Sequence, residues 1–199
     1  MAQNSTTILA SKSHRANITG TVISFTQTGT EYKISSSDTG SVTFSALNQF
    51  DLITITGTTN NNKTFTVKSV STSGDFVIVE EAVTTETSDG STTITVDTTG
   101  FVSDKFKGDG YYSHPDGVHT VAYKVDTSLT GSIKMQGSLA TTPTEDDYFD
   151  ISGTTYTSDQ STTIASFNFT GNFVWVRAKI TTTNASGNPS LVTSILLNN

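Results

Sequence analysis

Short runs in which apolar residues alternate with Thr, Ser or Lys recur along the chain, and they restrict its fold more than any other feature. In DLITIT, residues 51–56, Ile53 and Ile55 alternate with Thr54 and Thr56. Successive side chains of a strand point to opposite faces, so this pattern predicts strands with one buried face. Apolar residues at helical spacing are not sustained over several turns anywhere. The sequence therefore predicts an all-β protein with antiparallel sheets.

The composition supports an ordered β protein. About a third of the 199 residues are Ser or Thr, and Thr suits the outward face of a sheet because it is both β-branched and polar. A disordered Ser/Thr-rich stalk would be rich in Pro and poor in aromatic residues. This chain has only 3 Pro, against 11 Phe, 6 Tyr and 1 Trp.

Charge and cysteine content exclude several classes of partner and site. The formal net charge of −7 argues against a nucleic-acid partner, which requires a basic surface to neutralise phosphates. The chain has no Cys, which excludes disulfides and thiolate sites and favours assembly in a reducing cytoplasm. We expect neither a signal peptide at the N-terminus nor a segment that spans a bilayer, and hence no membrane partner.

The alternating runs fall into two blocks separated by a stretch rich in Gly and Asp. We expect a polar N-terminal arm at residues 1–17, a first β domain at 18–97, a linker at 98–117 and a second β domain, a sandwich, at 118–199. Each domain is expected to be an antiparallel barrel or sandwich. The strands predicted in the first domain include SVTFSAL, residues 41–47.

The run TTNNNK, residues 58–63, lies between two predicted strands of the first domain. Asn tolerates positive φ, so three Asn in succession predict the turn of a hairpin. A site for a polar ligand is the alternative interpretation.

Catalytic signatures are sparse, with no GxSxG elbow, phosphate loop, HExxH motif or dinucleotide fingerprint. Carboxylates do cluster in TEDDYFD, residues 144–150. We interpret this run as a helical turn or loop opened by Pro143 and capped by Thr144, with acidic residues near its N-terminal end. A depolymerase that uses Glu145 and Asp150 as paired carboxylates is the alternative.

Two of the three histidines lie close together in YYSHPDGVHTVAY, residues 111–123. His114 and His119 flank a Pro-Asp-Gly sequence that contains Asp116, and these residue types can bind metal ions. Turn geometry explains the same residues, since Pro presets φ and Gly accepts positive φ. We expect His119 to be a packed, hydrogen-bonded residue at the entrance of a strand.

The run NFVWVRAKI, residues 172–180, is apolar on one face, while the other face begins aromatic and ends basic. A central sandwich strand covered by a loop explains this pattern, and so does a strand that faces another subunit. The candidate interface comprises this second face and two residues of the N-terminal arm: Phe173, Trp175, Arg177, Lys179, His14 and Arg15.

Residues 50–96 contain a pattern of strand, Asn-containing turn, TFTV strand and E-x-x-T-x-E. The residues that fit it are Gly57, Asn60, Thr64, Phe65, Thr66, Val67, Glu80 or Glu81, Thr84, Glu86, Gly90 and Val96. This segment resembles a small β module common in structural proteins of tailed bacteriophages. Leu52 and Lys63 depart from the pattern, both at turns.

Residues 116–180 resemble a virion protein domain of marine cyanobacterial phages. The resemblance lies in Gly117, His119, Thr120, Val121 and the runs GSIKMQGSL, TPTEDDYFDI and TGNFVWVRA. The two resemblances together imply a non-enzymatic structural component of a phage virion without a cofactor.

From this resemblance we expect a capsid decoration or cement protein that is assembled in the host cytoplasm and incorporated into the virion. Its expected partners are copies of itself, as a homo-oligomer, and other virion proteins. A neck, tail or fibre protein is one alternative. The other is a carbohydrate-binding or receptor-binding adhesin, in which exposed Trp175, Tyr148 and Tyr156 stack on sugar rings.

Overall fold

The computed structural model describes residues 5–9, 12–13, 17–38, 40–112, 117–182 and 190–198. Within these residues the protein is built almost entirely from antiparallel strands, and helix is limited to α1 (Asp109–Tyr112) and a 3-10 turn (Glu145–Asp147). The all-β prediction is confirmed. The chain divides into two compact units, which we call the inserted unit (Arg15–Phe101) and the sandwich unit (Met1–His14 with Val102–Asn199).

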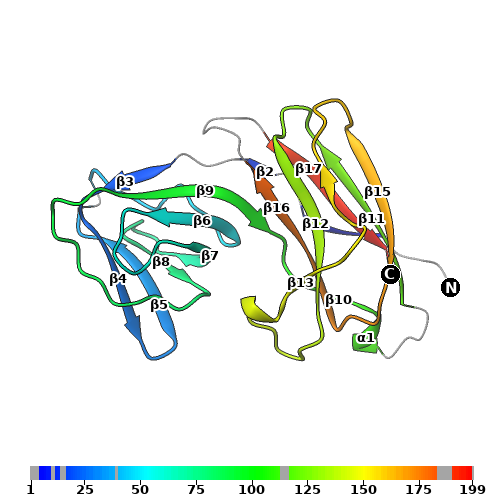
Figure 1. Cartoon of the computed structure of the whole chain (residues 1–199), viewed down its shortest axis with the longest axis horizontal. Helices are drawn as coiled ribbons and strands as arrows, with labels where there is room; N and C mark the ends of the chain where they lie inside the picture. Colours follow the sequence, from blue (N-terminus) through cyan, green and yellow to red (C-terminus); the bar gives the residue numbers. More distant parts are fainter. Residues whose placement is uncertain are drawn as a thin grey trace. The chain divides into compact units, whose positions relative to one another are not determined.

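The inserted unit is a strongly curved antiparallel sheet with the strand order β3-β9-β6-β7-β8-β5-β4 (Figure 1). Its strands are β3 (Ile18–Gly20), β4 (Ile23–Thr28), β5 (Glu31–Ser36), β6 (Asp51–Thr56), β7 (Thr64–Val70), β8 (Phe76–Val79) and β9 (Ile94–Val102). The strand β7 pairs with β6 through residues 64–66 and with β8 through residues 67–70, with a register shift after Val67. Such a shift bends a strand and increases its twist, which wraps the sheet around its core.

The apolar residues that alternate with Thr in the sequence form the core of this sheet. Ile53 and Ile55 are fully buried, while Thr54 is partly exposed and hydrogen-bonds across the sheet to Thr64 at 2.8 Å. The buried side chains form one cluster, whose members include Ile23, Phe25, Ile34, Phe44, Ile53, Ile55, Phe65, Val67, Val77 and Val96. Its position inside a curved sheet follows from strands with a single apolar face.

The segment SVTFSAL is not a strand, contrary to the prediction. Val42, Phe44 and Leu47 are buried, but the backbone follows successive turns. The Phe44 amide donates to the Gly74 carbonyl at 2.8 Å, and the Val42 amide donates to the Asp38 carbonyl at 2.8 Å. The apolar spacing was compatible with a strand, but these turns bury the same side chains without a strand ladder.

The hairpin predicted for TTNNNK is confirmed, because β6 and β7 are antiparallel neighbours on either side of it. Its turn is held by Asn61, which is 1% exposed. The Asn61 amide group donates to the Thr84 carbonyl at 2.9 Å and accepts from the Thr84 amide at 2.9 Å. The Glu86 carboxylate accepts from the backbone amides of Thr59 at 2.8 Å and Asn60 at 3.1 Å.

The E-x-x-T-x-E pattern therefore has a structural basis in this chain. Its last carboxylate, Glu86, binds the Asn-rich turn, and its first, Glu81, accepts from the amide and the hydroxyl of Thr66 at 2.6 and 2.8 Å. Both contacts tie the segment after β8 to the β6–β7 hairpin. The Asn61, Asn62 and Glu86 side chains that could have bound a polar ligand are used within the unit, while the Asn60 side chain is exposed.

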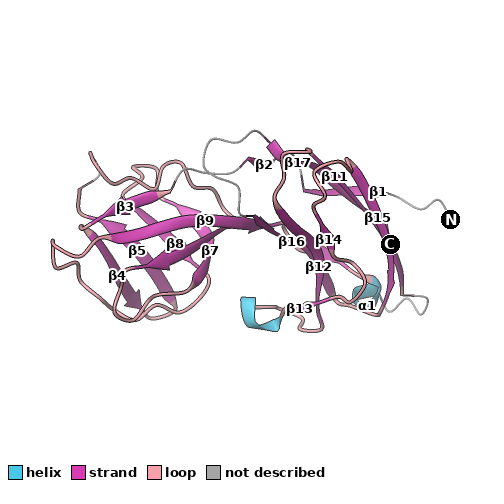
Figure 2. Cartoon of the chain, turned by 45° about the horizontal axis from the view of Figure 1, so that its top comes forward, coloured by secondary structure: helices cyan, strands magenta, loops and turns pink. Residues whose placement is uncertain are grey.

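The sandwich unit contains two sheets (Figures 1 and 2). The β11 sheet comprises β1 (Ser5–Leu9), β2 (Lys12–Ser13), β11 (Val118–Val125), β15 (Ile164–Thr170) and β17 (Ser190–Asn198). The β12 sheet comprises β10 (Phe106–Lys107), β12 (Gly131–Ser138), β13 (Phe149–Asp150), β14 (Tyr156–Thr157) and β16 (Trp175–Thr182).

Apolar side chains from both sheets form the core of this unit. Its fully buried members include Val121 and Tyr123 of β11, Ile133 and Met135 of β12, and Val176, Ala178 and Ile180 of β16. The Tyr123 hydroxyl donates to the Thr154 carbonyl at 2.8 Å, and the Thr154 hydroxyl accepts from the Met135 amide at 3.1 Å. Burial raises the pKa of Tyr123, and its hydrogen bond satisfies the hydroxyl between the sheets.

Two predicted boundaries differ from the structure. Residues 5–9 of the expected arm form β1, which pairs with β17 and buries Ile8 and Leu9. The expected linker, residues 98–117, contains the end of β9, then β10 and α1. These elements were missed because β10 and α1 are too short to show a period, and because β1 pairs with the other end of the chain.

We predict that Asn61→Ala destabilises the protein by about 2 kcal/mol, since the backbone amide and carbonyl of Thr84 lose their partner. The matched control is Asn60→Ala, because the Asn60 side chain is exposed; its effect is expected to stay within about 0.5 kcal/mol. Urea unfolding followed by circular dichroism measures both. Equal effects of the two substitutions would contradict the role assigned to Asn61.

Candidate interaction surface

The histidine that the sequence placed at a strand entrance is a packed core residue, as predicted. His119 is fully buried in β11, and its Nε2 lies 3.1 Å from the Gly171 carbonyl oxygen. Its ring stacks on Phe169 at a centroid distance of 4.8 Å and an interplanar angle of 20°. His114 and Asp116 lie outside the described residues.

Two of the candidate interface residues are used inside the sandwich unit. Phe173 is 8% exposed and contacts the rings of His119 and Phe149, each at a centroid distance of 6.0 Å. Arg177 is 5% exposed. Neither side chain is available to a partner while the unit is folded.

Arg177 is the centre of a polar network on the outer face of the β12 sheet. Its two terminal nitrogens donate to the two Glu145 oxygens at 2.7 Å each, and its Nε donates to Gln136 at 3.0 Å. The guanidinium also lies 3.6 Å from the centre of the Tyr148 ring. Burial raises the pKa of Tyr148 to about 12, although Arg177 opposes the shift. A bidentate, stacked arrangement of this kind is specific to Arg.

The acidic cluster is a 3-10 turn with Thr144 at its N-cap position, as predicted. The Asp147 carboxylate accepts from the amide and hydroxyl of Thr144 at 2.7 and 2.8 Å. Asp150 pairs with Lys134 and accepts from Gln136. Partial burial opposes a low pKa at Asp150, yet these hydrogen bonds hold it below its usual value. A depolymerase needs one carboxyl that keeps its proton near neutral pH, and this environment works against that role for Asp150.

The remaining candidate interface residues are Trp175 and Lys179, both partly exposed; His14 and Arg15 lie outside the described residues. The Trp175 indole donates to the Thr141 carbonyl at 3.1 Å. Its ring meets Tyr111 edge-on at a centroid distance of 5.3 Å, and the Lys105 ammonium lies 4.9 Å from its centre.

Six large apolar or aromatic side chains are classed as exposed among the described residues, and five of them share one end of the sandwich unit. These five are Tyr111 (44%), Tyr112 (54%), Val118 (50%), Leu139 (64%) and Phe149 (44%). The sixth, Ile164 (59%), begins β15 and pairs with Lys124 at the far end of the β11–β15 pair. We call the group of five, together with Trp175, the apolar end.

Strand register explains why these residues meet. Trp175, at the start of β16, pairs with Ser138 at the end of β12, immediately before Leu139. Phe149 pairs with Gly137, which is the residue before Ser138 in β12. The Gly110 amide of α1 donates to the Phe173 carbonyl at 2.9 Å, which places the two tyrosines at the same end.

Val118 begins β11 and therefore lies at the same end, but its side chain points to the opposite face of β11 from the buried His119, which contacts Phe173. Exposed apolar side chains scattered singly are ordinary, whereas a contiguous group marks a binding surface. Tyr111, Tyr112 and Trp175 are contiguous, because the Tyr111 ring contacts both of the others. The apolar end is therefore the best candidate for a functional site in this protein.

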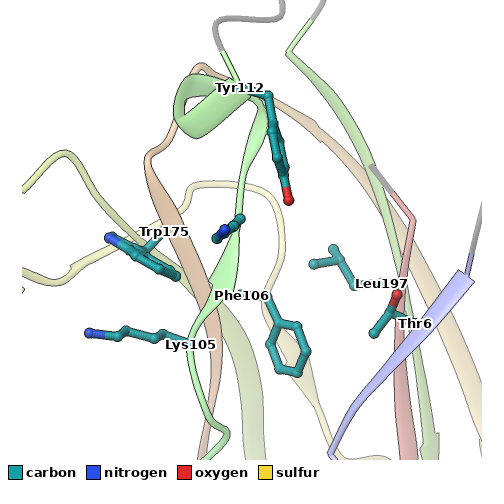
Figure 3. Close-up of a pocket in the computed structure, with 7 residues that line it drawn as sticks. Thr6, Lys105, Phe106, Tyr112, Trp175 and Leu197 are labelled. Atoms are coloured by element: carbon teal, nitrogen blue, oxygen red, sulfur yellow. The ribbon is translucent and has the colours of Figure 1, made fainter. Parts of the chain in front are cut away.

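A pocket of about 330 Å³ opens beside this surface, between β10 and the strands β1 and β17. Figure 3 shows Phe106 and Leu197 pointing toward its interior, with the Tyr112 hydroxyl above them. Trp175 and Lys105 lie together on one side. The Lys107 ammonium lies 4.0 Å from the centre of the Tyr111 ring. The pocket thus combines an apolar lining with two ammonium groups.

Of these residues, the sequence pointed to Trp175 but not to Tyr111, Tyr112 or Leu139. The adjacent Tyr pair in a segment without alternation was the available signal, since aromatic residues in an irregular stretch need a packing or binding partner. Leu139 continued the apolar alternation of β12 beyond the last paired residue, so its exposure could not be read from the pattern.

Within the described ranges, no three His, Asp or Glu side chains are grouped as a metal site, and no helix is long and apolar enough to cross a membrane. Comparison of the chain with known protein families, with curated proteins and with solved structures found no match.

We predict that Arg177→Ala destabilises the protein by about 3 kcal/mol, because it leaves the partly buried Glu145 carboxylate without its partner. Arg177→Lys keeps the charge but loses the bidentate geometry, so its effect should be intermediate. Lys179→Ala, on the same face of the same strand, is the control and should cost less than about 1 kcal/mol. Urea unfolding measures all three, and a Lys179→Ala effect as large as that of Arg177→Ala would contradict this assignment.

Proposed function

We propose that this protein is a non-enzymatic structural component of a phage virion, a capsid decoration or cement protein, that attaches through its apolar end. The observation that carries the proposal is the clustering of exposed apolar side chains at one end of the sandwich unit. The rest of the chain is rich in Thr and acidic residues, which favour solubility, whereas an uncovered apolar cluster lowers it. A partner that covers the cluster explains why it is present.

The use of the carboxylates supports a structural role. Glu81 and Glu86 hold segments of the inserted unit together, and Glu145 and Asp150 hold the outer layer of the sandwich unit. Side chains with the chemistry for catalysis thus stabilise the fold. The resemblance of both segments to phage structural proteins points to the same function.

The mechanism of such a protein is additive binding. A single small apolar surface gives weak attachment, but many copies on one particle, each also contacting its neighbours, sum to a stable layer. A neck, tail or fibre position would use the same surface in the same way.

A receptor-binding role is the second proposal, and the pocket beside Trp175 favours it. A platform for sugar rings is best built from coplanar aromatic side chains. The ring of Tyr111 is inclined by 61° to Trp175 and by 72° to Tyr112, Tyr156 is 7% exposed, and Tyr148 is stacked against Arg177. This geometry favours protein contact over sugar stacking.

We predict that Leu139→Asp lowers incorporation into particles by about tenfold, because it places a charge in the surface that the partner would cover. Ile164→Asp is the matched control, since Ile164 is equally exposed at the other end of the unit, and it should leave incorporation unchanged. The measurement is the number of copies per purified particle, by quantitative mass spectrometry. Equal incorporation of both variants, or a protein found only free in the host cell, would contradict the proposal.

A further inference from the structure

The segment that follows the 3-10 turn presents an exposed aromatic side chain among carboxylates. Phe149 is 44% exposed, and Asp146, Asp147 and Asp150 flank it, all three exposed. Asp150 is already paired with Lys134, whereas Asp147 accepts from the amide and hydroxyl of Thr144, which leave its negative charge in place. We call Asp146–Asp150 the acidic knob.

The pocket beside the apolar end has the opposite character. Phe106, Leu197 and Trp175 line it with apolar surface, and Lys105 and Lys107 contribute ammonium groups. Its volume of about 330 Å³ lies at the small end of ligand pockets and accommodates one large side chain. In a chain with a formal charge of −7, the Lys105 ammonium, 4.9 Å from the centre of the Trp175 ring, gives this pocket a local positive charge that attracts carboxylates.

The strand order separates knob and pocket. Residues 136 and 137 of β12 pair with β13 on one side and with β16 on the other. Residues 175 and 176 of β16 pair with β12 on one side and with β10 on the other. The order is thus β13-β12-β16-β10, so the knob on β13 and the pocket beside β10 lie at opposite edges of the β12 sheet.

We propose that the acidic knob of one copy binds in the lysine-bordered pocket of a second copy of this chain. Phe149 enters the apolar pocket, and the carboxylates of Asp146 and Asp147 approach the Lys105 ammonium. Because knob and pocket lie at opposite edges of one sheet, each copy that donates its knob keeps its pocket open for the next. Such a contact is heterologous, and it builds a ring or an open chain rather than a closed two-fold dimer.

This inference rests on the proposed function, because it names the neighbouring copy as one of the contacts that hold the protein in its layer. The charged groups determine which surfaces associate and raise the association rate. The Phe149 ring, once buried in the pocket, supplies most of the affinity.

The test uses the full chain and measures its mass by sedimentation velocity at concentrations up to about 1 mM, a range that detects weak contacts. The wild type is expected to form oligomers as concentration rises. The pocket variant Lys105→Glu and the knob variant Asp146→Lys should each weaken association by about tenfold or more. Lys124→Glu makes the same charge change at the far end of β11 and should associate like the wild type.

A mixture of variants distinguishes a heterologous contact from other modes. Phe149→Ser combined with Asp146→Lys removes the knob and leaves the pocket, whereas Lys105→Glu does the reverse. Mixed in equal amounts, they should form a one-to-one pair that grows no further. Since Phe149 also packs on Phe173, Asp146→Lys alone serves as the second knob variant if the double variant unfolds.

A wild type that stays monomeric at about 1 mM, or pocket and knob variants that associate like Lys124→Glu, would overturn the inference. The inference would also be overturned if the mixture of the knob variant and the pocket variant contained only monomers, or if it formed oligomers larger than a pair. If these results are obtained while Leu139→Asp still lowers incorporation by about tenfold, the proposed function stands and the apolar end binds another virion protein. Normal incorporation of Leu139→Asp together with knob-to-pocket oligomers would overturn the proposed function alone.

Discussion

The buried ion pair between Arg177 and Glu145 determines what the sandwich unit presents at its surface. Arg177 is 5% exposed on β16, and a charge at that depth is tolerated only when it is paired and hydrogen-bonded. Glu145 meets this requirement and thereby anchors the segment after β12 over the outer face of the sheet. Tyr148 stacks on the same guanidinium, and Phe149 and Asp150 then pair with β12. The ion pair between β16 and the 3-10 turn thus helps to hold in place the segment that carries the exposed Phe149.

Much of the fold could be predicted because its determinants are local. Ile53 and Ile55 alternate with Thr54 in one strand, the Asn triplet marks the adjoining turn, and Pro143 precedes the 3-10 turn. The confirmed position of His119 followed in the same way, from a turn followed by alternating residues. In each case a few neighbouring residues determine backbone geometry without help from the rest of the chain.

The remaining features depend on contacts between distant residues. β1 is a strand because β17, near the other end of the chain, pairs with it. SVTFSAL is not a strand because Gly74 and Asp38 accept its amides. The charged face of NFVWVRAKI suggested an interface, but Arg177 is satisfied by Glu145, more than thirty residues earlier in the chain. Such pairings cannot be read from spacing, and they decide whether a polar or aromatic residue faces solvent or the interior.

The two units share one physical strategy, which bears on how the protein acts. Asn61 and Glu86 in the inserted unit, and Arg177 and Glu145 in the sandwich unit, join irregular segments to strands by charge-assisted or buried hydrogen bonds. Polar groups used in this way are withdrawn from solvent, so they contribute little to recognition of a partner. Recognition is then left to exposed apolar side chains, and strand register gathers most of these at one end of the sandwich unit. A surface of this kind binds by burial of area, which fits the structural role proposed above.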